Sequence, residues 1–278
     1  MHAALLLARE GHTIEIFEKE PKPGGMLQYY LPKFRFPRKG IEKKAEQLEE
    51  LGIKINYNVR IGKDRPLDGI VGEFDAVVLA PGEWNARKLG LKGEELENVS
   101  YWIDFLRDYN EDKITSLKEK KVVVVGGGDT AIDCARVAIR LGADTTLAYR
   151  KRKEDMPAME AEIKAAEEDD IEFLFNASPL EILGSEKVEK MVFEETIVKE
   201  SGMEKTGKNI EVRADLVLIA IGQIPDESIL ENSPYKNFDE LPEKVFLAGD
   251  LVNEKKLIVT AIVSATEAVG KIKGLLSQ

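Results

Sequence analysis

The 278-residue chain is poor in the residues that most often carry metal, disulfide and histidine chemistry: it has one cysteine, Cys134, and two histidines, His2 and His12. A single thiol cannot form an internal disulfide, a Cys-x-x-Cys redox pair or a cysteine-ligated cluster, which favours a reducing compartment. Two histidines are too few for an ordinary zinc site or a histidine-based catalytic triad to be expected. We therefore predict no metal site.

Positive charge and long apolar runs are also scarce. The chain has 40 Lys and Arg against 51 Asp and Glu residues, a formal net charge of −11, so it lacks the basic surface of a nucleic-acid-binding protein. The apolar run at residues 3–8 ends at Arg9 without a basic segment before it, too short for a signal peptide or a membrane span. We predict no nucleic-acid partner, no membrane segment and a cytoplasmic location.

The order of apolar segments predicts an α/β fold. Five runs have the apolar composition of strands buried on both faces: residues 13–17, 74–80, 121–125, 214–220 and 244–248. Helical patterns over residues 41–51 and 130–141 lie between them and end at glycines. This alternation predicts parallel sheets covered by helices, whereas residues 171–212, with glycine-containing turns, predict an antiparallel crossover.

One glycine-rich loop has the context of a dinucleotide-binding motif, between a predicted strand and a predicted helix. Its residues are Gly126, Gly127, Gly128, Asp129, Thr130 and Ala131, which fit the pattern G-x-G-x-x-A. Gly126 can turn the chain tightly, Gly128 lets backbone approach a pyrophosphate, and Ala131 lets the helix pack close to the strand. The helix N-terminus then offers N–H groups to the anion. Asp129 can either cap the helix or touch the ligand.

Four consecutive cations, Arg150, Lys151, Arg152 and Lys153, end the strand predicted after this helix. An NAD site places an acidic residue there to bind the adenosine ribose, whereas cations suit the 2′-phosphate of NADP(H). NADP(H) is therefore favoured over NAD(H). The alternative is a solvated basic turn without a ligand.

A second dinucleotide site is predicted near the start of the chain. The strand at residues 13–17 closes with Glu18, placed to accept hydrogen bonds from ribose hydroxyls, and Gly24 and Gly25 follow in a loop that permits close backbone approach. Residues 3–9 read as the first helix of this fold. The strand and glycine turn that should precede that helix are not in the sequence.

The motifs resemble the flavin- and NADPH-binding module of the glutamate synthase small subunit, shared with dihydropyrimidine dehydrogenase and related NADPH:ferredoxin oxidoreductases. The matching segments are Glu18-Lys19, Gly24-Gly25, Pro32-x-Phe34-Arg35, residues 126–135, 149–150, 156–158 and 220–223, and residues 245–250. The resemblance covers nearly the whole chain. It implies two nested Rossmann-like domains of the glutathione-reductase type, each with a parallel central sheet.

The resemblance also implies domain limits and ligand contacts. An FAD-binding domain of residues 1–117 and 236–278 would enclose an NADPH-binding domain of residues 118–235. The implied FAD contacts are Glu18, Lys19, Gly24, Gly25, Met26, Arg35, Ile61, Ala80, Gly82, Gly249 and Asp250. The implied NADPH contacts are Gly126, Gly127, Gly128, Asp129, Thr130, Arg150, Lys151, Ala220, Ile221 and Gly222, to which we add Arg152 from its charge and position.

For the activity, the resemblance implies an FAD-dependent NAD(P)H oxidoreductase in which NADPH reduces FAD. The electrons would pass to an acceptor in another chain, an iron–sulfur protein or a glutamate synthase-like partner. The flavin carries this chemistry, so no catalytic protein side chain is predicted. The lone thiol argues against a disulfide reductase. The alternative is a truncated or non-catalytic NADP(H)-binding subunit without flavin, with a docking or regulatory role, because the family's flavin pyrophosphate loop is not in this sequence.

The first strand of a doubly wound sheet lies at its centre, so the strand ending at Glu18 is expected to lack one hydrogen-bonded neighbour. Two hypotheses supply that neighbour. Either the sequence is a truncated version of a longer protein, or a partner chain provides the strand and the loop.

Overall fold

The computed structural model describes residues 1–277, and the chain divides into two compact units. Unit 1 comprises Met1–Gln28, Phe36–Trp84 and Pro225–Gln278. Unit 2 comprises Tyr29–Arg35 and Asn85–Ile224. Each unit is therefore assembled from segments that are distant in sequence, as nested domains require.

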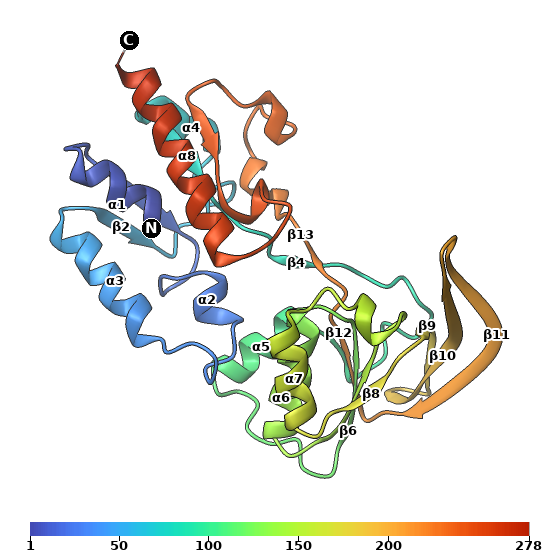
Figure 1. The fold of residues 1–278 in the computed structure, drawn as a ribbon. Helices are drawn as coiled ribbons and strands as arrows, with labels where there is room; N and C mark the ends of the chain where they lie inside the picture. The colour runs from blue at the N-terminus through green and yellow to red at the C-terminus, as the bar shows by residue number, and fades with distance from the viewer. Residues whose placement is uncertain (278) are drawn as a thin grey trace. The chain divides into compact units, whose positions relative to one another are not determined.

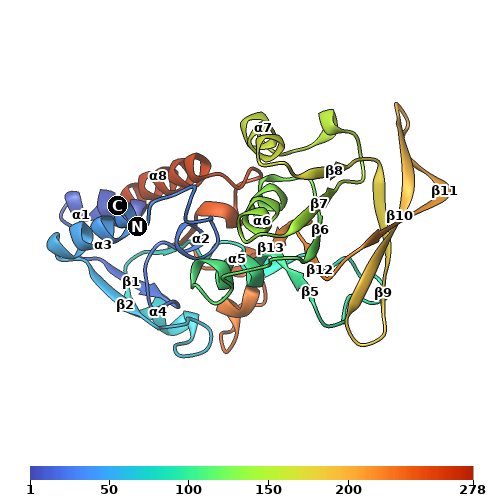
Figure 2. The same ribbon diagram turned by 90° about the horizontal axis from the view of Figure 1, so that it is seen from below.

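Unit 2, part of the ribbon in Figure 1, is built on a five-stranded parallel sheet with the strand order β5-β12-β6-β7-β8, whose strands are labelled in Figure 2. These strands are β5 (Val99–Tyr101), β6 (Lys121–Val125), β7 (Asp144–Ala148), β8 (Glu172–Leu174) and β12 (Leu216–Ile219). The central strand β6 is buried from Val122 to Val125. Strands covered on both faces have this continuous apolar composition, which is why the sequence pattern located β6 and β12.

The two faces of this sheet are covered differently (Figure 2). Helices α5 (Trp102–Asn110), α6 (Asp129–Arg140) and α7 (Glu160–Glu168) cover one face. The other face packs against an antiparallel meander of β9 (Ala177–Gly184), β10 (Val188–Lys199) and β11 (Gly202–Arg213). Met191 and Phe193 of β10 enter the shared core with Val123 and Val217. The predicted antiparallel crossover is confirmed for residues 177–213, whereas residues 172–174 of the predicted segment form β8 of the parallel sheet.

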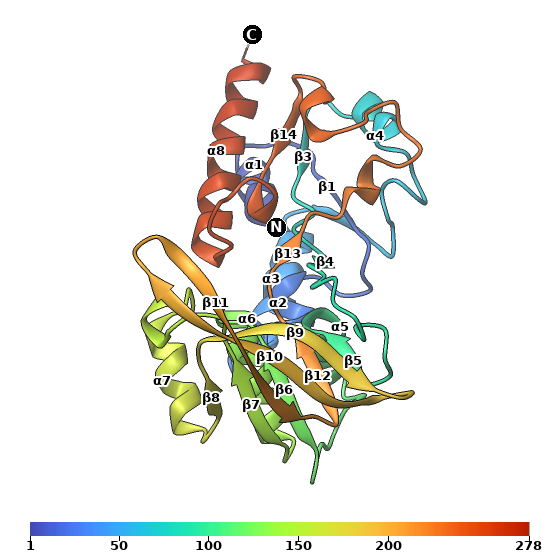
Figure 3. The same cartoon turned by 90° about the vertical axis from the view of Figure 1, so that its right-hand side faces the viewer.

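Unit 1 contains two separate pairs of parallel strands. Strand β1 (Glu15–Glu18) pairs with β2 (Lys54–Tyr57), and β3 (Val77–Leu79) pairs with β14 (Val245–Leu247), beside which it lies in Figure 3. Among residues 1–277, no strand pairs with the second edge of β1 or of β3.

Helices α1 (His2–Arg9) and α8 (Ile258–Leu276) pack together in unit 1. Leu7 of α1 and Ile272 of α8 share an apolar cluster with Val78 and Phe246. The remaining helices of this unit are α2 (Met26–Tyr29), whose last residue belongs to unit 2, α3 (Lys39–Glu50) and α4 (Leu67–Glu73). In the described residues, no helix has both the length and the apolar character needed to cross a bilayer.

Short elements complete the chain. They are β4 (Asn85–Ala86), which pairs with β13 (Gln223–Ile224), and the 3-10 turns η1 (Lys153–Asp155), η2 (Glu227–Leu230), η3 (Phe238–Glu240) and η4 (Gly249–Leu251).

The predicted α/β class with parallel sheets is confirmed, whereas the units divide at other residues than the predicted domains. Residues 85–117, predicted to belong with the N-terminal domain, lie in unit 2. The reason is that β5 extends the sheet of unit 2 by pairing with β12, and α5 packs against α6. Which unit binds which cofactor stays a prediction.

Candidate functional site

The glycine loop of unit 2 is held tightly on one side. A Cβ atom added at Gly126 would lie 2.2 Å from the carbonyl oxygen of Ala220 and 2.9 Å from the Cβ of Ala131. A Cβ at Gly127 would lie 2.4 Å from the ring of Tyr149. Glycine is therefore required at both positions by contacts within the protein, and Ala131 allows α6 to approach β6 closely, as the motif predicts.

The other side of the loop is open. Gly128 is the N-cap of α6, and a Cβ added there would meet no atom within 4 Å. The N–H groups of Gly128, Asp129 and Thr130 donate to no acceptor within residues 1–277, as expected for the first turn of a helix. Bare N–H groups at the positive end of a helix dipole fit a pyrophosphate.

Asp129 has a structural partner. Its carboxylate accepts a hydrogen bond of 2.8 Å from the backbone N–H of Met159, just before α7. The N–H of Ala158 donates to the carbonyl of Gly127 at 3.2 Å. The segment before α7 is thus hydrogen-bonded to the glycine loop. Asp129 does not cap its own helix, and its carboxylate is already engaged by the protein.

The basic turn after β7 contains two kinds of cation. Arg152 forms ion pairs with Asp155 at 2.9 Å and Glu154 at 3.2 Å, and Lys153 pairs with Glu167. Arg150 is exposed and Lys151 is half-buried, and neither side chain has an ion pair among the described residues. Two of the four predicted cations are therefore available to an anionic ligand.

The backbone of this turn is held by hydrogen bonds from β10 and from the residue just before β9. The carbonyl of Arg150 accepts a hydrogen bond of 2.7 Å from Thr196 Oγ1, and the carbonyl of Lys151 accepts one of 3.0 Å from the N–H of Asn176. The main chain of the two available cations is thus held in place by these hydrogen bonds.

Residues 220–222 are the third segment predicted to contact NADPH. The N–H of Ala220 donates to Val125 at 2.8 Å, and the carbonyl of Gly222 accepts from the N–H of Arg87 and from Trp102 Nε1. Ile221 packs against the core under the sheet. The carboxyl ends of β6, β7 and β12 therefore bring all three predicted segments together, at the edge where doubly wound sheets bind dinucleotides.

In unit 1, Glu18 lies at the end of β1 and accepts a hydrogen bond of 2.9 Å from the N–H of Glu20. Burial raises the pKa of Glu18 above its usual value, opposed by that hydrogen bond. Lys19 contacts Asp226 at 3.5 Å, and burial lowers the pKa of its ammonium although Asp226 opposes the shift.

The predicted FAD-contact glycines differ in their surroundings. Gly24 has a φ of +113°, and a Cβ there would lie 2.6 Å from Ile41, so internal packing explains this glycine. Gly25 (φ +53°) and Gly82 (φ +76°) would each place a Cβ near Trp84 alone, at 3.8 Å and 3.4 Å. On the side where a Cβ would point, these two glycines therefore face only that indole and their own chain neighbours.

Three further residues predicted to contact FAD lie at the ends of helices or strands. Met26 begins α2 and is half-buried, and Ala80 is exposed directly after β3. The N–H of Gly249 donates to Ser264 Oγ at 2.9 Å.

The Asp250 carboxylate lies near a charge pair between buried Glu83 and the more exposed Lys256. Burial raises the pKa of Asp250, an effect that Lys256 opposes. The Lys256 ammonium donates to the buried Glu83 at 2.9 Å and to the carbonyl of Asp250. Glu83 and Lys256 are functional candidates that the sequence patterns missed, because only the fold brings residues 83, 250 and 256 together.

Arg35 and Ile61, both predicted FAD contacts, are engaged elsewhere in the protein. Arg35 belongs to unit 2 and donates to both oxygens of Asp133 at 2.7 and 2.8 Å and to Glu162 at 2.6 Å. Burial raises the pKa of Asp133 to about 6, opposed by the Arg35 charge. Ile61 packs in the apolar cluster around Leu67. Their contact with FAD stays a prediction.

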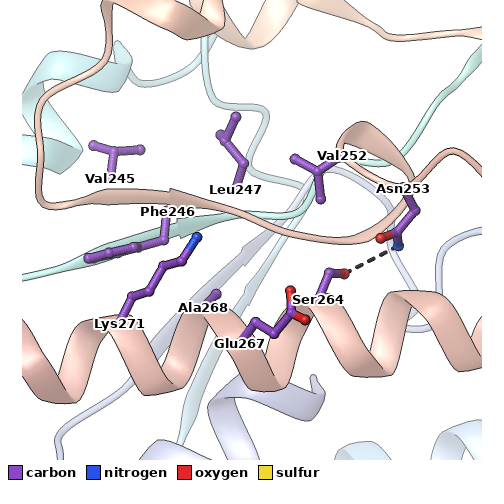
Figure 4. A pocket seen from close by; sticks show the side chains of 9 residues that line it. All are labelled: Val245, Phe246, Leu247, Val252, Asn253, Ser264, Glu267, Ala268 and Lys271. Atoms are coloured by element: carbon purple, nitrogen blue, oxygen red, sulfur yellow. Dashed lines mark hydrogen bonds between the residues drawn. The ribbon is translucent and has the colours of Figure 1, made fainter.

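A cavity of about 410 Å³ lies between β14, the two residues after η4 and α8 (Figure 4). Its lining residues are Val245, Phe246, Leu247, Val252, Asn253, Ser264, Glu267, Ala268 and Lys271. Ser264 links it to the predicted FAD loop through its hydrogen bond with Gly249. No residue predicted to bind FAD or NADPH lines this cavity.

Residues 1–267 match the family model described as pyridine nucleotide-disulphide oxidoreductase. The glutamate synthase [NADPH] small chain of Halomonas elongata is 32% identical in an alignment covering 95% of this chain and 63% of that protein. NADPH-Fe(3+) oxidoreductase subunit beta of Geobacter sulfurreducens is 34% identical, with coverages of 96% and 40%. These matches confirm the resemblance predicted from the motifs, although the chain spans less than two-thirds of each relative.

A solved structure shows the same fold. Mycobacterium tuberculosis FprA in complex with NADPH aligns with a TM-score of 0.83 at 19% identity, covering 99% of this chain and 81% of FprA.

Proposed function

Because the chain belongs to the pyridine nucleotide-disulphide oxidoreductase family, we propose that it is an oxidoreductase that binds FAD and NADPH and passes electrons to an acceptor in another polypeptide. The observation that carries the proposal is the arrangement of the predicted NADPH contacts in unit 2. There, unpaired N–H groups at the start of α6 and the available cations Arg150 and Lys151 follow the carboxyl ends of adjacent parallel strands.

The residues of unit 1 fit FAD. Glu18 lies at the strand end where a dinucleotide ribose is bound, and Gly25 and Gly82 leave backbone open to close approach. FAD, when bound, would accept two electrons from NADPH and release them to the acceptor. The protein residues would bind and orient the two cofactors.

Reduction of a disulfide by the protein's own thiols is not part of the proposal. Cys134 is the only cysteine, and it is fully buried in α6. Burial raises the pKa of its thiol well above the usual value, so a reactive thiolate is disfavoured. An acceptor in another chain is supported by relatives whose names describe them as subunits or as a small chain.

Flavin absorbance tests this function. We expect protein isolated from its native host to show flavin absorption bands that bleach during anaerobic titration with NADPH, with a weaker response to NADH. A colourless protein that binds NADPH would instead support the alternative of a docking or regulatory subunit without flavin. Failure to bind either cofactor would contradict both functions.

We also propose that a further parallel strand completes unit 1. Strands β1 and β3 each have a second edge with no strand partner in residues 1–277. Helices α1 and α8 nevertheless pack against apolar side chains next to or within these strand pairs, namely Ile14 before β1, Val78 of β3 and Phe246 of β14. Unpaired strand edges leave backbone N–H and C=O groups without hydrogen bonds and favour addition of a strand.

The source of this strand is tested by the mass of the native polypeptide. A mass above the 31.1 kDa of the present sequence would place the strand in a longer form of the same chain. A mass of 31.1 kDa together with a co-purifying polypeptide would indicate a partner. If a 31.1 kDa protein without a partner protects the amides of β1 and β3 from hydrogen exchange, no added strand is needed.

A further inference from the structure

The indole of Trp84 lies against Gly25 and Gly82, two of the glycines predicted to contact FAD. Its Cζ2 atom is 3.8 Å from the position of a Cβ on Gly25, and its Nε1 atom is 3.4 Å from that of a Cβ on Gly82. Apart from the chain neighbours of each glycine, no other described residue approaches either position within 4 Å. A ligand that comes close to both glycines would therefore meet this indole.

The orientation of the ring is fixed by two polar contacts. Trp84 Nε1 donates a hydrogen bond to the carbonyl of Pro81, and the Lys19 ammonium lies 4.0 Å from the ring centroid. Lys19 is held in turn by Asp226, which also binds Arg60 at 3.2 Å. A cation over the face of an indole is favourable, and more so when partly buried. The half-buried ring is thus anchored before any ligand arrives.

The contacts around Trp84 differ from those of a residue that only fills the core. Trp102, the other tryptophan, is 3% exposed in unit 2 and forms an edge contact with Tyr30. Trp84 remains half-buried, and the backbone it touches has positive φ at both glycines. A large aromatic surface beside two glycines that carry no side chain is suited to stacking or edge contact with a planar ring.

We infer that Trp84 forms an aromatic wall of the FAD site and that Lys19 positions its ring. The inference rests on the proposed function. It assigns to Trp84 a binding role in addition to packing, and to Lys19 an indirect role through the indole.

The first test uses hydroxyl-radical footprinting of the unaltered protein with and without FAD. We expect FAD to slow oxidation of Trp84 several-fold and to leave Trp102 unchanged. An unchanged rate at Trp84 in protein shown to hold FAD would overturn the inference. If no FAD is bound at all, the proposed function fails, and the inference fails with it.

The second test compares Trp84→Ala, Trp84→Phe and the control Trp102→Phe. Stacking of an aromatic side chain on a base contributes about 1–3 kcal/mol, so we expect Trp84→Ala to weaken FAD binding roughly 5- to 150-fold. Phenylalanine should restore most of the affinity, and Trp102→Phe should bind normally. A solely structural role predicts a lower melting temperature of the FAD-free Trp84→Ala protein without a change in FAD affinity.

Lys19→Met separates positioning from charge. It keeps an unbranched side chain against the indole but removes the ammonium, so we expect a smaller loss of FAD affinity than in Trp84→Ala. In the Trp84→Phe background, whose ring lacks the Nε1 anchor, the effect of Lys19→Met should grow. Identical effects in both backgrounds would show that Lys19 does not act through the ring.

Discussion

Alanine at Gly126 is expected to destabilise unit 2 strongly. The new Cβ would lie 2.2 Å from the carbonyl oxygen of Ala220, which is backbone at the end of β12 and cannot move as a side chain would. Overpacking of this kind costs about 1–3 kcal/mol or more. The φ of +153° adds strain for any residue with a side chain. Calorimetry of the ligand-free protein should show a fall of several degrees in the melting temperature of unit 2.

Gly128→Ala is the matched control at the open side of the same loop. Its Cβ would meet nothing within 4 Å, and the backbone at φ −92° and ψ 175° suits alanine. We expect a stability loss below about 1 kcal/mol, because alanine is only a poorer N-cap than glycine. NADPH affinity, however, should fall at least tenfold, because the methyl group would occupy the space through which a pyrophosphate approaches the N–H groups. Equal melting temperatures for the two variants would contradict the packing argument, and unchanged NADPH affinity in Gly128→Ala would contradict the ligand position.

The loop could be predicted from sequence because its geometry is local. A buried strand, three glycines and an amphipathic helix are adjacent in the chain, and the contact between Gly126 and Ala131 spans five residues. The need for Gly127 was less visible. It depends on Tyr149, which reaches the loop only because β7 pairs with β6.

The domain limits could not be predicted in the same way. The residues of β5, Val-Ser-Tyr, form no long apolar run, and their pairing with β12 joins segments more than 100 residues apart in sequence. Arg35 is a similar case. Its attachment to unit 2 depends on Asp133 and Glu162, two carboxylates on different helices that no local pattern connects with residue 35.

The basic turn shows how the structure refines a correct local observation. Four cations in sequence suggested one phosphate site, but acidic neighbours occupy half of them. Asp155, three residues after Arg152, hinted at this pairing, whereas the partner of Lys153 is Glu167 of α7. Charge in a run of residues is therefore a weaker guide to ligand binding than charge that is left unpaired in the fold.

Arg150→Ala is expected to reduce NADPH affinity about 10- to 100-fold and to change NADH affinity little. Only NADPH has the 2′-phosphate, and a hydrogen bond to a charged group contributes about 1.5–3 kcal/mol. Arg150 is exposed at the end of β7, with its backbone fixed by Thr196 and its side chain without an ion pair in the described chain. Isothermal titration with NADPH and NADH measures both affinities, and losses of equal size would refute the assignment to the 2′-phosphate.

Arg152→Ala is the control that distinguishes position from charge. It removes the same charge two residues away, but its guanidinium already binds Asp155 and Glu154. To reach a phosphate it would have to break those pairs, and exposed pairs of this kind contribute at most about 1 kcal/mol. We therefore expect NADPH affinity to fall less than about fivefold, because Arg152 would contribute only through the positive electrostatic potential near the site. If Arg152→Ala instead matches Arg150→Ala, Arg152 must leave its carboxylates when NADPH binds. The variant Asp155→Asn should then tighten NADPH binding, because it weakens the pair that competes for the guanidinium.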